Sequence, residues 1–416
     1  MRKVRWIGFL MVSVSWSKAQ TCDTYVGGYI PEWTNATTVD YTKLSHAFYA
    51  FGSTNPAGDV IVADQNALNS FKTATSGKQR FLSLGGAGDN SLSSMTTSAS
   101  ALQTFANNCS TFCQTNALQG IDVDWEGIIT AQDSVKYGAL MRALATALYN
   151  NGLQLTATIA YGSYGGDFYN VGALQKADWI QLMVYDQTGT WAESPYGNHS
   201  TFQQMLDAIN YWTNRGYTDL SRIVIGLPFY GYRFHSFQGG LATALSYNEI
   251  VSAQPYLSCD QDEVSMTFFN SPETIRKKTA YVKTHGLKGV MIWEMSQDIP
   301  SSQEKSLLSA ISLASCDLPA ACNSFFVTGL SRETQEEIRV APNPVDHILE
   351  VSLQSLQNRI SKLELIDNLG RLLFIKDDSF WEAVEMINVS KLAPGIYYLK
   401  ITLLSQRTAA KRVVKL

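Results

Sequence analysis

Short apolar runs alternate with amphipathic stretches from residue 24 to residue 315. The runs are rich in branched and aromatic residues, which is typical of buried strands. We expect eight strands, at residues 24–30, 44–51, 80–86, 120–126, 153–160, 179–186, 222–229 and 288–294. The stretches between them carry apolar residues at helical spacing. One predicted helix also has boundary signals, with Ser271 as N-cap, Pro272 in the first turn and Gly286 beyond the end.

Eight strands that alternate with helices predict an α/β fold, a (β/α)8 barrel of the TIM type. A doubly wound open sheet is the alternative, and it would need a nucleotide site at the end of a strand. The glycine cluster LGGAG at residues 84–88 lacks the GxGxxG spacing of such a site. The barrel is therefore the favoured prediction.

The pattern changes after residue 316. Residues 317–337 are polar and contain Pro and Gly, as expected of a linker. Residues 338–416 carry short alternating segments with frequent turn signals and predict an all-β sandwich domain. Its strands are expected at residues 348–353, 362–367, 371–376, 395–402 and 412–416. The barrel domain is expected to occupy residues 20–316.

Residues 1–19 have the features of a secretory signal peptide. Basic residues precede an apolar run that is too short to span a membrane, and small residues precede a predicted cleavage before Gln20. The protein is therefore expected to be secreted, with no transmembrane segment.

Charge and the metal-binding residue types exclude several partners. The net charge of −4 gives no reason to expect nucleic acid or an anionic membrane. The histidines are scattered, so we predict no metal site and no cofactor. Export permits disulfides, and Cys316 and Cys322 could pair with each other or with Cys22. Cys109 and Cys113 share an apolar helical stripe and are expected to be small core residues.

The segment GIDVDWE at residues 120–126 carries an acid at every second position. In a strand, Asp122, Asp124 and Glu126 share one face. Glu126 is then nearest to the carboxyl end of the fourth strand, where the active sites of such barrels lie. Two deeper carboxylates would raise the pKa of Glu126, so that it could act as a general acid at neutral pH.

Other interpretations of the acidic strand are a calcium site or a buried acid network with arginine partners. Calcium ligands usually come from loops, so catalysis is favoured. A glycosidase of the usual type needs two carboxylates on opposite faces of the sugar. The second group would have to come from another strand, for example Asp186, or from the substrate itself.

On these residues the chain resembles family 18 of the glycoside hydrolases, the chitinases and endo-β-N-acetylglucosaminidases. QGIDVDWE is similar to the family signature DGxDxDxE. Further similar segments, in order along the chain, are GYIPEW (28–33), HAFYAFG (46–52), SLGG (83–86), MVYD (183–186), GLPFYGYRF (226–234) and GVMIWEMSQD (289–298). The resemblance extends over most of residues 24–298.

The resemblance implies that the 2-acetamido group of the substrate attacks the anomeric carbon, with retention through an oxazolinium ion. Glu126 would protonate the glycosidic oxygen, and Asp124 would stabilise the acetamido N–H. Asp122 would share a proton with Asp124, supported by Tyr29 and Ser83. Tyr185 would hold the acetamido oxygen. The substrate-binding residues implied in the same way are Trp293, Asp186, Met183, Tyr29, Ser83 and Phe51.

The chain departs from the family motifs at two places. Gln119 replaces the first Asp of the signature, and Tyr232 intervenes before Arg233 where the motif usually has arginine directly after Tyr-Gly. Strand parity places Gln119 outside the column of acids. The segment 235–271 is too short for the full insertion that deepens the cleft in some members. We therefore expect a shallow cleft and an endo-acting enzyme.

The C-terminal region resembles the sorting domain of the type IX secretion system. The similar segments are VAPNPV (340–345), LELIDNLGRLL (363–373) and NVSKLAPGIYYLKI (388–401). A carbohydrate-binding sandwich is the alternative. The resemblance implies export through the periplasm to the medium or the cell surface, with the secretion machinery as a partner.

Together these patterns predict a secreted chitinase, which hydrolyses β-1,4-linked N-acetylglucosamine polymers or oligosaccharides. The alternatives are an endo-β-N-acetylglucosaminidase that cleaves the chitobiose core of N-glycans and a chitin-binding lectin without catalysis. A barrel that inhibits other enzymes is a further alternative. The presence of Glu126, Asp124, Asp122 and Tyr185 favours an enzyme.

Overall fold

The computed structural model describes residues 24–254, 257–316, 318, 327–328, 338–353, 359–367, 372–377, 381–404 and 408–416. The predicted signal peptide and most of the predicted linker lie outside these ranges, as do Cys22 and Cys322. The signal peptide and the disulfide pairings therefore stay predictions.

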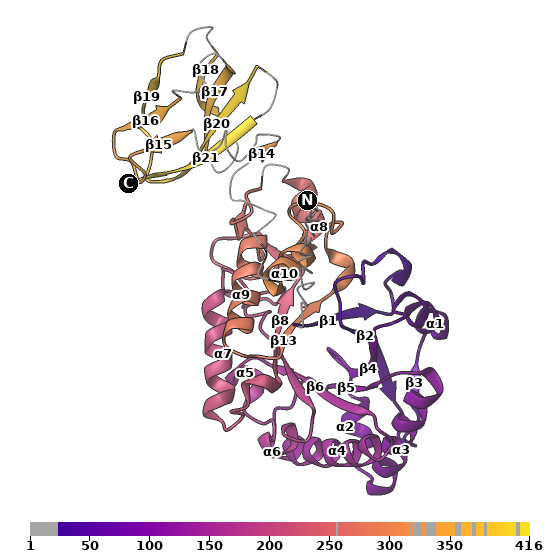
Figure 1. The fold of residues 1–416 in the computed structure, drawn as a ribbon. Coiled ribbons are helices and arrows are strands. Elements are labelled where there is room, and N and C mark those ends of the chain that lie inside the picture. Colours follow the sequence, from indigo (N-terminus) through magenta and orange to yellow (C-terminus); the bar gives the residue numbers. More distant parts are fainter. Residues whose placement is uncertain are drawn as a thin grey trace, which may run out of the picture.

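Eight parallel strands close into a barrel (Figure 1). They are β1 (Tyr25–Pro31), β2 (His46–Thr54), β4 (Gln79–Gly85), β5 (Gly120–Asp124), β6 (Gln154–Ala160), β7 (Trp179–Met183), β8 (Ile223–Pro228) and β13 (Gly289–Trp293). Hydrogen bonds join them in the order β1-β13-β8-β7-β6-β5-β4-β2, and β1 also pairs with β2. The short strand β3 (Val60–Val62) runs antiparallel to β2. The predicted TIM barrel is confirmed, and the open sheet is wrong because the sheet closes on itself.

Helices surround the barrel. They are α1 (Gln65–Ala74), α2 (Ser91–Met95), α3 (Ala99–Asn116), α4 (Ala131–Tyr149), α5 (Ser163–Gly166), α6 (Val171–Leu174), α7 (Phe202–Asn214), α9 (Pro272–Thr284) and α10 (Leu307–Ser315), with 3-10 turns η1 (Ala36–Thr38), η2 (Leu220–Arg222) and η3 (Met295–Gln297). The predicted boundary signals are confirmed in α9. The Ser271 side chain accepts a hydrogen bond from the Thr274 N–H, and Gly286 adopts a φ of +69° beyond the last turn.

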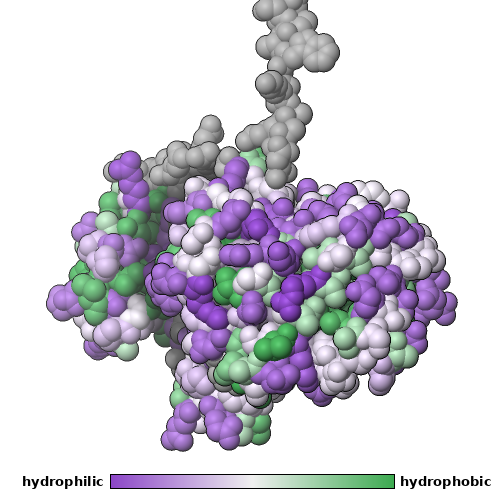
Figure 2. All heavy atoms as spheres, turned by 90° about the horizontal axis from the view of Figure 1, so that it is seen from below, coloured by the Kyte–Doolittle hydropathy of each residue, from purple (hydrophilic) through white to green (hydrophobic). Residues whose placement is uncertain are grey.

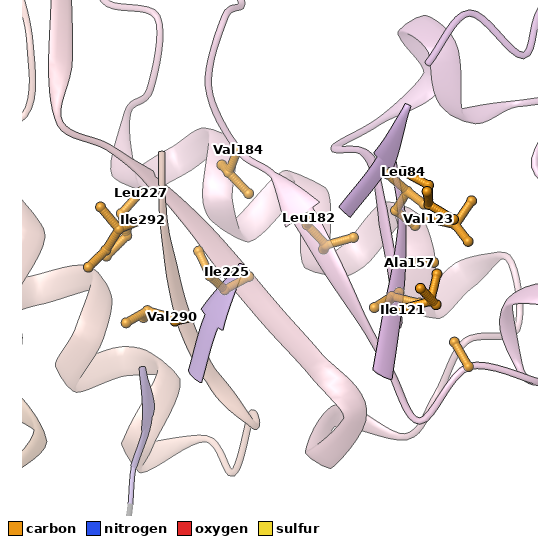
Figure 3. Close-up of a cluster of buried hydrophobic side chains, with 14 of the residues drawn as sticks. Leu84, Ile121, Val123, Ala157, Leu182, Val184, Ile225, Leu227, Val290 and Ile292 are labelled. Atoms are coloured by element: carbon orange, nitrogen blue, oxygen red, sulfur yellow. The ribbon is translucent and has the colours of Figure 1, made fainter. Parts of the chain in front are cut away.

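Every second strand residue packs outward beneath the helices (Figure 3). Ile121 and Val123 of β5, Leu182 of β7 and Ile225 of β8 are all fully buried in this layer. Successive residues of a strand point to opposite faces of the sheet. Asp122, which stands between Ile121 and Val123, therefore points into the barrel. Apolar burial contributes about 25 cal/mol per Å². The outer layer therefore helps to offset the cost of polar groups inside.

Two strands end earlier than predicted. β5 ends at Asp124 and β7 at Met183, whereas residues 126 and 186 were expected. The backbone turns away at the rim of the barrel, where Gly127 has a φ of +75° and Asp186 a φ of +59°. Glu126 consequently lies on a rim segment and not within the strand.

A small α+β insertion follows β8. It contains β9 (Tyr230–Phe234), β10 (Ala242–Ser246), α8 (Tyr247–Ala253), β11 (Glu263–Val264) and β12 (Thr267–Phe268). The strands form an antiparallel sheet in the order β10-β9-β12-β11. The segment expected to be too short for a full insertion therefore still builds a reduced one beside the barrel.

The C-terminal region forms two antiparallel sheets, shown in orange to yellow in Figure 1. One contains β14 (Val327–Thr328), β21 (Thr408–Lys415), β20 (Gly395–Leu403), β17 (Ile360–Asp367) and β18 (Leu372–Lys376), and the other contains β15 (Arg339–Ala341), β16 (Ile348–Ser352) and β19 (Val384–Asn388). Both sheets contribute to one apolar core, for example with Val351 and Leu399. The predicted sandwich is confirmed. The sequence missed β19 because one of its buried positions is Glu385, paired with Lys376 at 2.7 Å.

Cys109 and Cys113 lie on the buried face of α3 as free thiols, which confirms the expectation that they are core residues. Burial raises the pKa of Cys109 well above its usual value and that of Cys113 to about 12. Both thiols are thus held in the protonated form.

The surface is mixed in character. On the face in Figure 2, hydrophilic residues are widespread and apolar residues gather in small patches between them. Within the part of the chain that the structure describes, no helix is both long and apolar enough to cross a membrane.

We expect Leu140→Ala to lower the free energy of unfolding by about 2–5 kcal/mol, because it leaves a cavity in a fully buried part of α4. Chemical denaturation followed by circular dichroism measures this change. Val135→Ala is the control, since Val135 on the same helix is 62% exposed and its truncation should cost less than about 0.5 kcal/mol. Equal losses in the two variants would contradict the packing described for α4.

Candidate functional site

Asp122 is fully buried inside the barrel and accepts hydrogen bonds from several strands. Tyr29 Oη of β1 and Ser83 Oγ of β4 each donate to its Oδ2 at 2.7 Å. Thr156 Oγ1 of β6 donates to Oδ1 at 2.7 Å. Burial raises the pKa of Asp122, and the hydrogen bonds from Thr156, Tyr29 and Ser83 oppose this rise.

Sequence reasoning singled out Tyr29 and Ser83 but missed three further partners of Asp122. These are Thr156, Thr158 Oγ1, which donates at 3.1 Å to Oδ2, and Gln181 Nε2, at 3.4 Å from Oδ1. A signal was present, since both threonines stand at alternate positions of an apolar strand and Gln181 interrupts another. Buried polar groups need partners, and a barrel brings such positions together.

Asp124 lies one step closer to the rim and is also buried. Its Oδ1 has no hydrogen-bond partner among the described residues. Burial raises the pKa of Asp124 well above its usual value, and the charges of Glu126 and Asp122 raise it further. No hydrogen bond joins Asp124 to Asp122 among the described contacts, so the expected shared proton is not seen as a direct bond between them. Burial and the two neighbouring charges therefore favour the protonated form of Asp124.

Glu126 is partly exposed at the rim. Burial raises its pKa, and the charge of Asp186 is the second cause. Asp122 and Asp124 were expected to supply this effect. The charges of Asp124 and Glu126 do act on each other. Asp186, which follows β7 on the rim, is a further charge that the sequence did not indicate.

Tyr185 and Asp186 follow β7 on the same rim. Tyr185 is buried, and its hydroxyl donates a long hydrogen bond to Met291 Sδ at 4.0 Å. Asp186 Oδ1 accepts hydrogen bonds from Tyr230 Oη at 2.6 Å and Tyr232 Oη at 2.8 Å. One carboxylate oxygen of Asp186 is thus held in place, while its side chain remains 47% exposed.

The predicted substrate-binding residues Trp293, Phe51 and Met183 also lie at the carboxyl ends of barrel strands. The Trp293 ring stacks on Phe51 with centroids 5.6 Å apart and lies at the same distance from Tyr29. Tyr29 in turn bonds to Asp122. The structure therefore brings the aromatic floor and the acid column into one site.

The two departures from the family motifs have distinct structural settings. Gln119 Oε1 accepts a hydrogen bond from the Arg80 N–H at 2.6 Å, and the Gln119 N–H donates to the Arg80 carbonyl at 2.7 Å. Gln119 thus ties β5 to β4, away from the acid column. Tyr232 holds Asp186, whereas the adjacent Arg233 is exposed.

A buried lysine anchors the loop that follows Asp186. Lys278 of α9 donates from Nζ to the Ser200 carbonyl and to Asn270 Oδ1, both at 2.8 Å. Ser200 Oγ donates to the Val184 carbonyl at 2.5 Å, which closes the base of the loop. Burial lowers the pKa of Lys278 to about 7.

His199 occupies the inner side of this loop. It is fully buried, neither ring nitrogen has a hydrogen bond to any described residue, and Nδ1 lies 3.5 Å from Asp186 Oδ1. Sequence reasoning missed both Lys278 and His199. The signal for Lys278 was its place in the apolar stripe of α9, between Ile275 and Val282.

Among the described residues, no three His, Cys, Asp or Glu side chains are grouped so that they could hold a metal ion.

We expect Lys278→Met to change how stability depends on pH. Lys278 has a folded-state pKa near 7, below its usual 10.5, so between these values the unfolded chain binds more protons. The free energy of unfolding of the wild type should therefore rise relative to that of the variant as pH increases from about 7 to about 10. Denaturant titrations across this range measure the difference.

Lys277→Met is the matched control, because Lys277 is exposed and pairs with Glu273 only at 3.7 Å. Its stability difference from the wild type should not change with pH over the same range. A flat difference for Lys278→Met would contradict the buried position of its ammonium group.

Comparisons with known proteins agree with this geometry. The sequence profile of Glycosyl hydrolases family 18 matches residues 25–298, and that of a Secretion system C-terminal sorting domain matches residues 339–415. Chitotriosidase-1 of Mus musculus is 26% identical over 364 residues, which cover 72% of this chain and 78% of that protein.

Two solved structures illustrate the range of similar folds. The chitinase ChiB of Flavobacterium johnsoniae is 27% identical with a TM-score of 0.62, and covers 71% of this chain and 94% of its own. A chitinase-like agglutinin of Robinia pseudoacacia, 21% identical with a TM-score of 0.58, covers 69% and 98% and shares the fold. The family profile spans most of the chain, including the acidic strand, the Tyr185–Asp186 rim and Trp293. The chain therefore belongs to glycosyl hydrolase family 18.

Proposed function

We propose that the protein hydrolyses chitin or chito-oligosaccharides with retention, through attack by the substrate's own acetamido group. Family membership and relatives named chitinases support the reaction class. The observation that carries the proposal is the unpartnered Oδ1 of Asp124, in a buried position. A buried carboxyl group without a partner is costly, and an acetamido N–H would supply the missing donor.

Tyr185 provides the complementary group. Its hydroxyl has no nitrogen or oxygen partner among the described residues and can donate to the acetamido oxygen. An acetamido group held between Tyr185 and Asp124 presents its oxygen to the anomeric carbon. Trp293 supplies an apolar surface for the sugar ring.

In the first step Glu126 transfers its proton to the glycosidic oxygen. The C1–O bond breaks, the acetamido oxygen bonds to C1, and the leaving chain departs as an alcohol. The resulting oxazolinium ion is positively charged, and this charge favours the ionised form of Asp124 beside it. The proton of Asp124 then passes to Asp122, whose own pKa is raised by burial. This transfer requires the two side chains to come into contact during the reaction, since no hydrogen bond joins them among the described contacts.

In the second step Glu126, now ionised, takes a proton from water. The water oxygen attacks C1, the oxazolinium ring opens, and the product regains the β configuration. The proton returns from Asp122 to Asp124. Glu126 thus acts first as acid and then as base.

We also propose that the C-terminal sandwich directs export by the type IX machinery to the medium or the cell surface. The sorting-domain match to residues 339–415 supports export.

Glu126→Gln tests the reaction. The variant cannot donate the proton, and we expect at least about a hundredfold loss of activity on a fully acetylated chito-oligosaccharide. Product masses and NMR of freshly formed reducing ends measure cleavage and anomer for the full chain. A high-mannose glycopeptide is assayed in parallel.

Wild-type cleavage of the oligosaccharide to β-anomers, lost in the variant, supports the proposal. Cleavage of the glycopeptide alone would assign the protein to the N-glycan-cleaving members of the family. Oligosaccharide binding without turnover in the wild type would mean that the barrel is a lectin.

Asp186→Asn tests the cause of the raised pKa of Glu126. The charge of Asp186 raises that pKa, so its removal should move the basic limb of the kcat/KM profile to lower pH. The exposed Asp207 on α7 provides a control of equal charge change, Asp207→Asn, which should leave the limb in place. If the basic limb of the kcat/KM profile does not move in Asp186→Asn, the charge of Asp186 does not act on the pKa of Glu126, whatever the change in rate.

A further inference from the structure

A pocket of about 360 Å³ lies between the rim of the barrel and the small insertion. It is lined by Asp186, Tyr230, Tyr232, Ala244, Leu245, Ser246, Glu249, Trp293 and Gln297. Asp186 and Trp293 also belong to the proposed reaction site. A sugar unit in this pocket would therefore be a neighbour of the unit whose bond is cleaved.

Two carboxylates face this pocket. Glu249 is the third residue of α8, and its Oε2 accepts hydrogen bonds from the Ser246 N–H and Oγ, both at 2.8 Å. These two bonds lower the pKa of Glu249, so its negative charge is maintained. Asp186 uses Oδ1 for Tyr230 and Tyr232, and its Oδ2 has no hydrogen bond among the described residues.

Among the residues that the structure describes, no lysine or arginine lines the pocket. His199 is fully buried, and its Nδ1 lies 3.5 Å from Oδ1 of Asp186, the oxygen that the tyrosines already hold. Tyr232 stands where the family motif usually has arginine, and Arg233 is exposed. The negative charges of the pocket are therefore not balanced by a cation within it.

The pocket also offers an unused acceptor. Gln297 Oε1 is buried and has no hydrogen-bond partner among the described residues. The two tyrosine hydroxyls of the lining already donate to Asp186. A ligand that donates hydrogen bonds and carries positive charge would match this arrangement.

We propose that this pocket binds a sugar unit with a free 2-ammonium group, so that partly deacetylated chitin is a preferred substrate. This inference rests on the proposed function. The unit at the reacting centre must keep its acetamido group, because that group attacks. The neighbouring unit needs none, and its ammonium group would lie among the carboxylates of Glu249 and Asp186 and the Gln297 amide.

The gain in selectivity should be modest because Glu249 is exposed and its charge is screened by water and salt. We expect kcat/KM for a partly deacetylated oligosaccharide to exceed that for the fully acetylated one of equal length by about fivefold at low salt, and by less at high salt.

Glu249→Gln tests the proposal in the full chain. Glutamine can also fill the third helical position of the capping motif, so α8 should keep its start while the charge is lost. Competition between the two oligosaccharides, with products sequenced by mass spectrometry, gives the selectivity ratio and the identity of the unit beside each cleaved bond. Asp207→Asn is the charge-matched control outside the pocket.

We expect the wild type and Asp207→Asn to favour the deacetylated substrate and Glu249→Gln to lose most of that preference. No preference in the wild type, or the same preference in Glu249→Gln, would overturn the inference while cleavage of the fully acetylated substrate still upholds the proposed function. No cleavage of either substrate would overturn the proposed function itself. In that case the pocket is tested by binding alone, with titration calorimetry of the wild type and Glu249→Gln and the same two oligosaccharides. Equal affinities of the wild type for the two oligosaccharides would overturn the inference.

Discussion

The hydrogen bonds that converge on Asp122 hold together the interior on which the rest of the site depends. They come from β1, β4, β6 and β7, while Asp122 itself lies on β5. Taking an ionisable group out of water is expensive unless its oxygens find donors. The barrel supplies these donors from inward positions, and the apolar layer beneath the helices compensates for an interior that is unusually polar. Asp124 and Glu126 can then be placed above a carboxyl group that is already satisfied.

Much of the fold could be predicted because the period-two and helical patterns are local. The apolar runs around Ile121, Leu182 and Ile225 predict the strands that contain these residues. Thr158 and Gln181 stand out as polar positions in apolar strands, but the sequence could not assign them to Asp122, because they meet it only once the sheet closes. The role of Asp186 beside Glu126 depends on where two strands end, and the rim turns that end them have no strong sequence signal. In the sandwich, strand β19 was missed because the buried Glu385 makes its sequence look like that of a polar segment.

Asp186 connects three parts of the structure that are distant in sequence. Behind it, His199 and the loop closed by Ser200 are anchored to α9 through Lys278. Beside it, Tyr230 and Tyr232 fix one oxygen from the insertion. Toward the site, its charge acts on Glu126. A structural change in the anchoring loop or in the insertion can therefore alter the pKa of Glu126 through Asp186, without any direct contact between the changed residue and the substrate.

The two free thiols of α3 have a consequence for folding if, as we propose, the protein is exported to an oxidising compartment. Cys109 and Cys113 are buried and protonated, so in the folded barrel neither can attack a disulfide. During folding, before α3 docks, both are competent to form wrong links with the other cysteines. The order of folding and oxidation therefore matters. If α3 packs early, only the cysteines outside the core remain free to form disulfides, and burial of Cys109 and Cys113 prevents incorrect pairing.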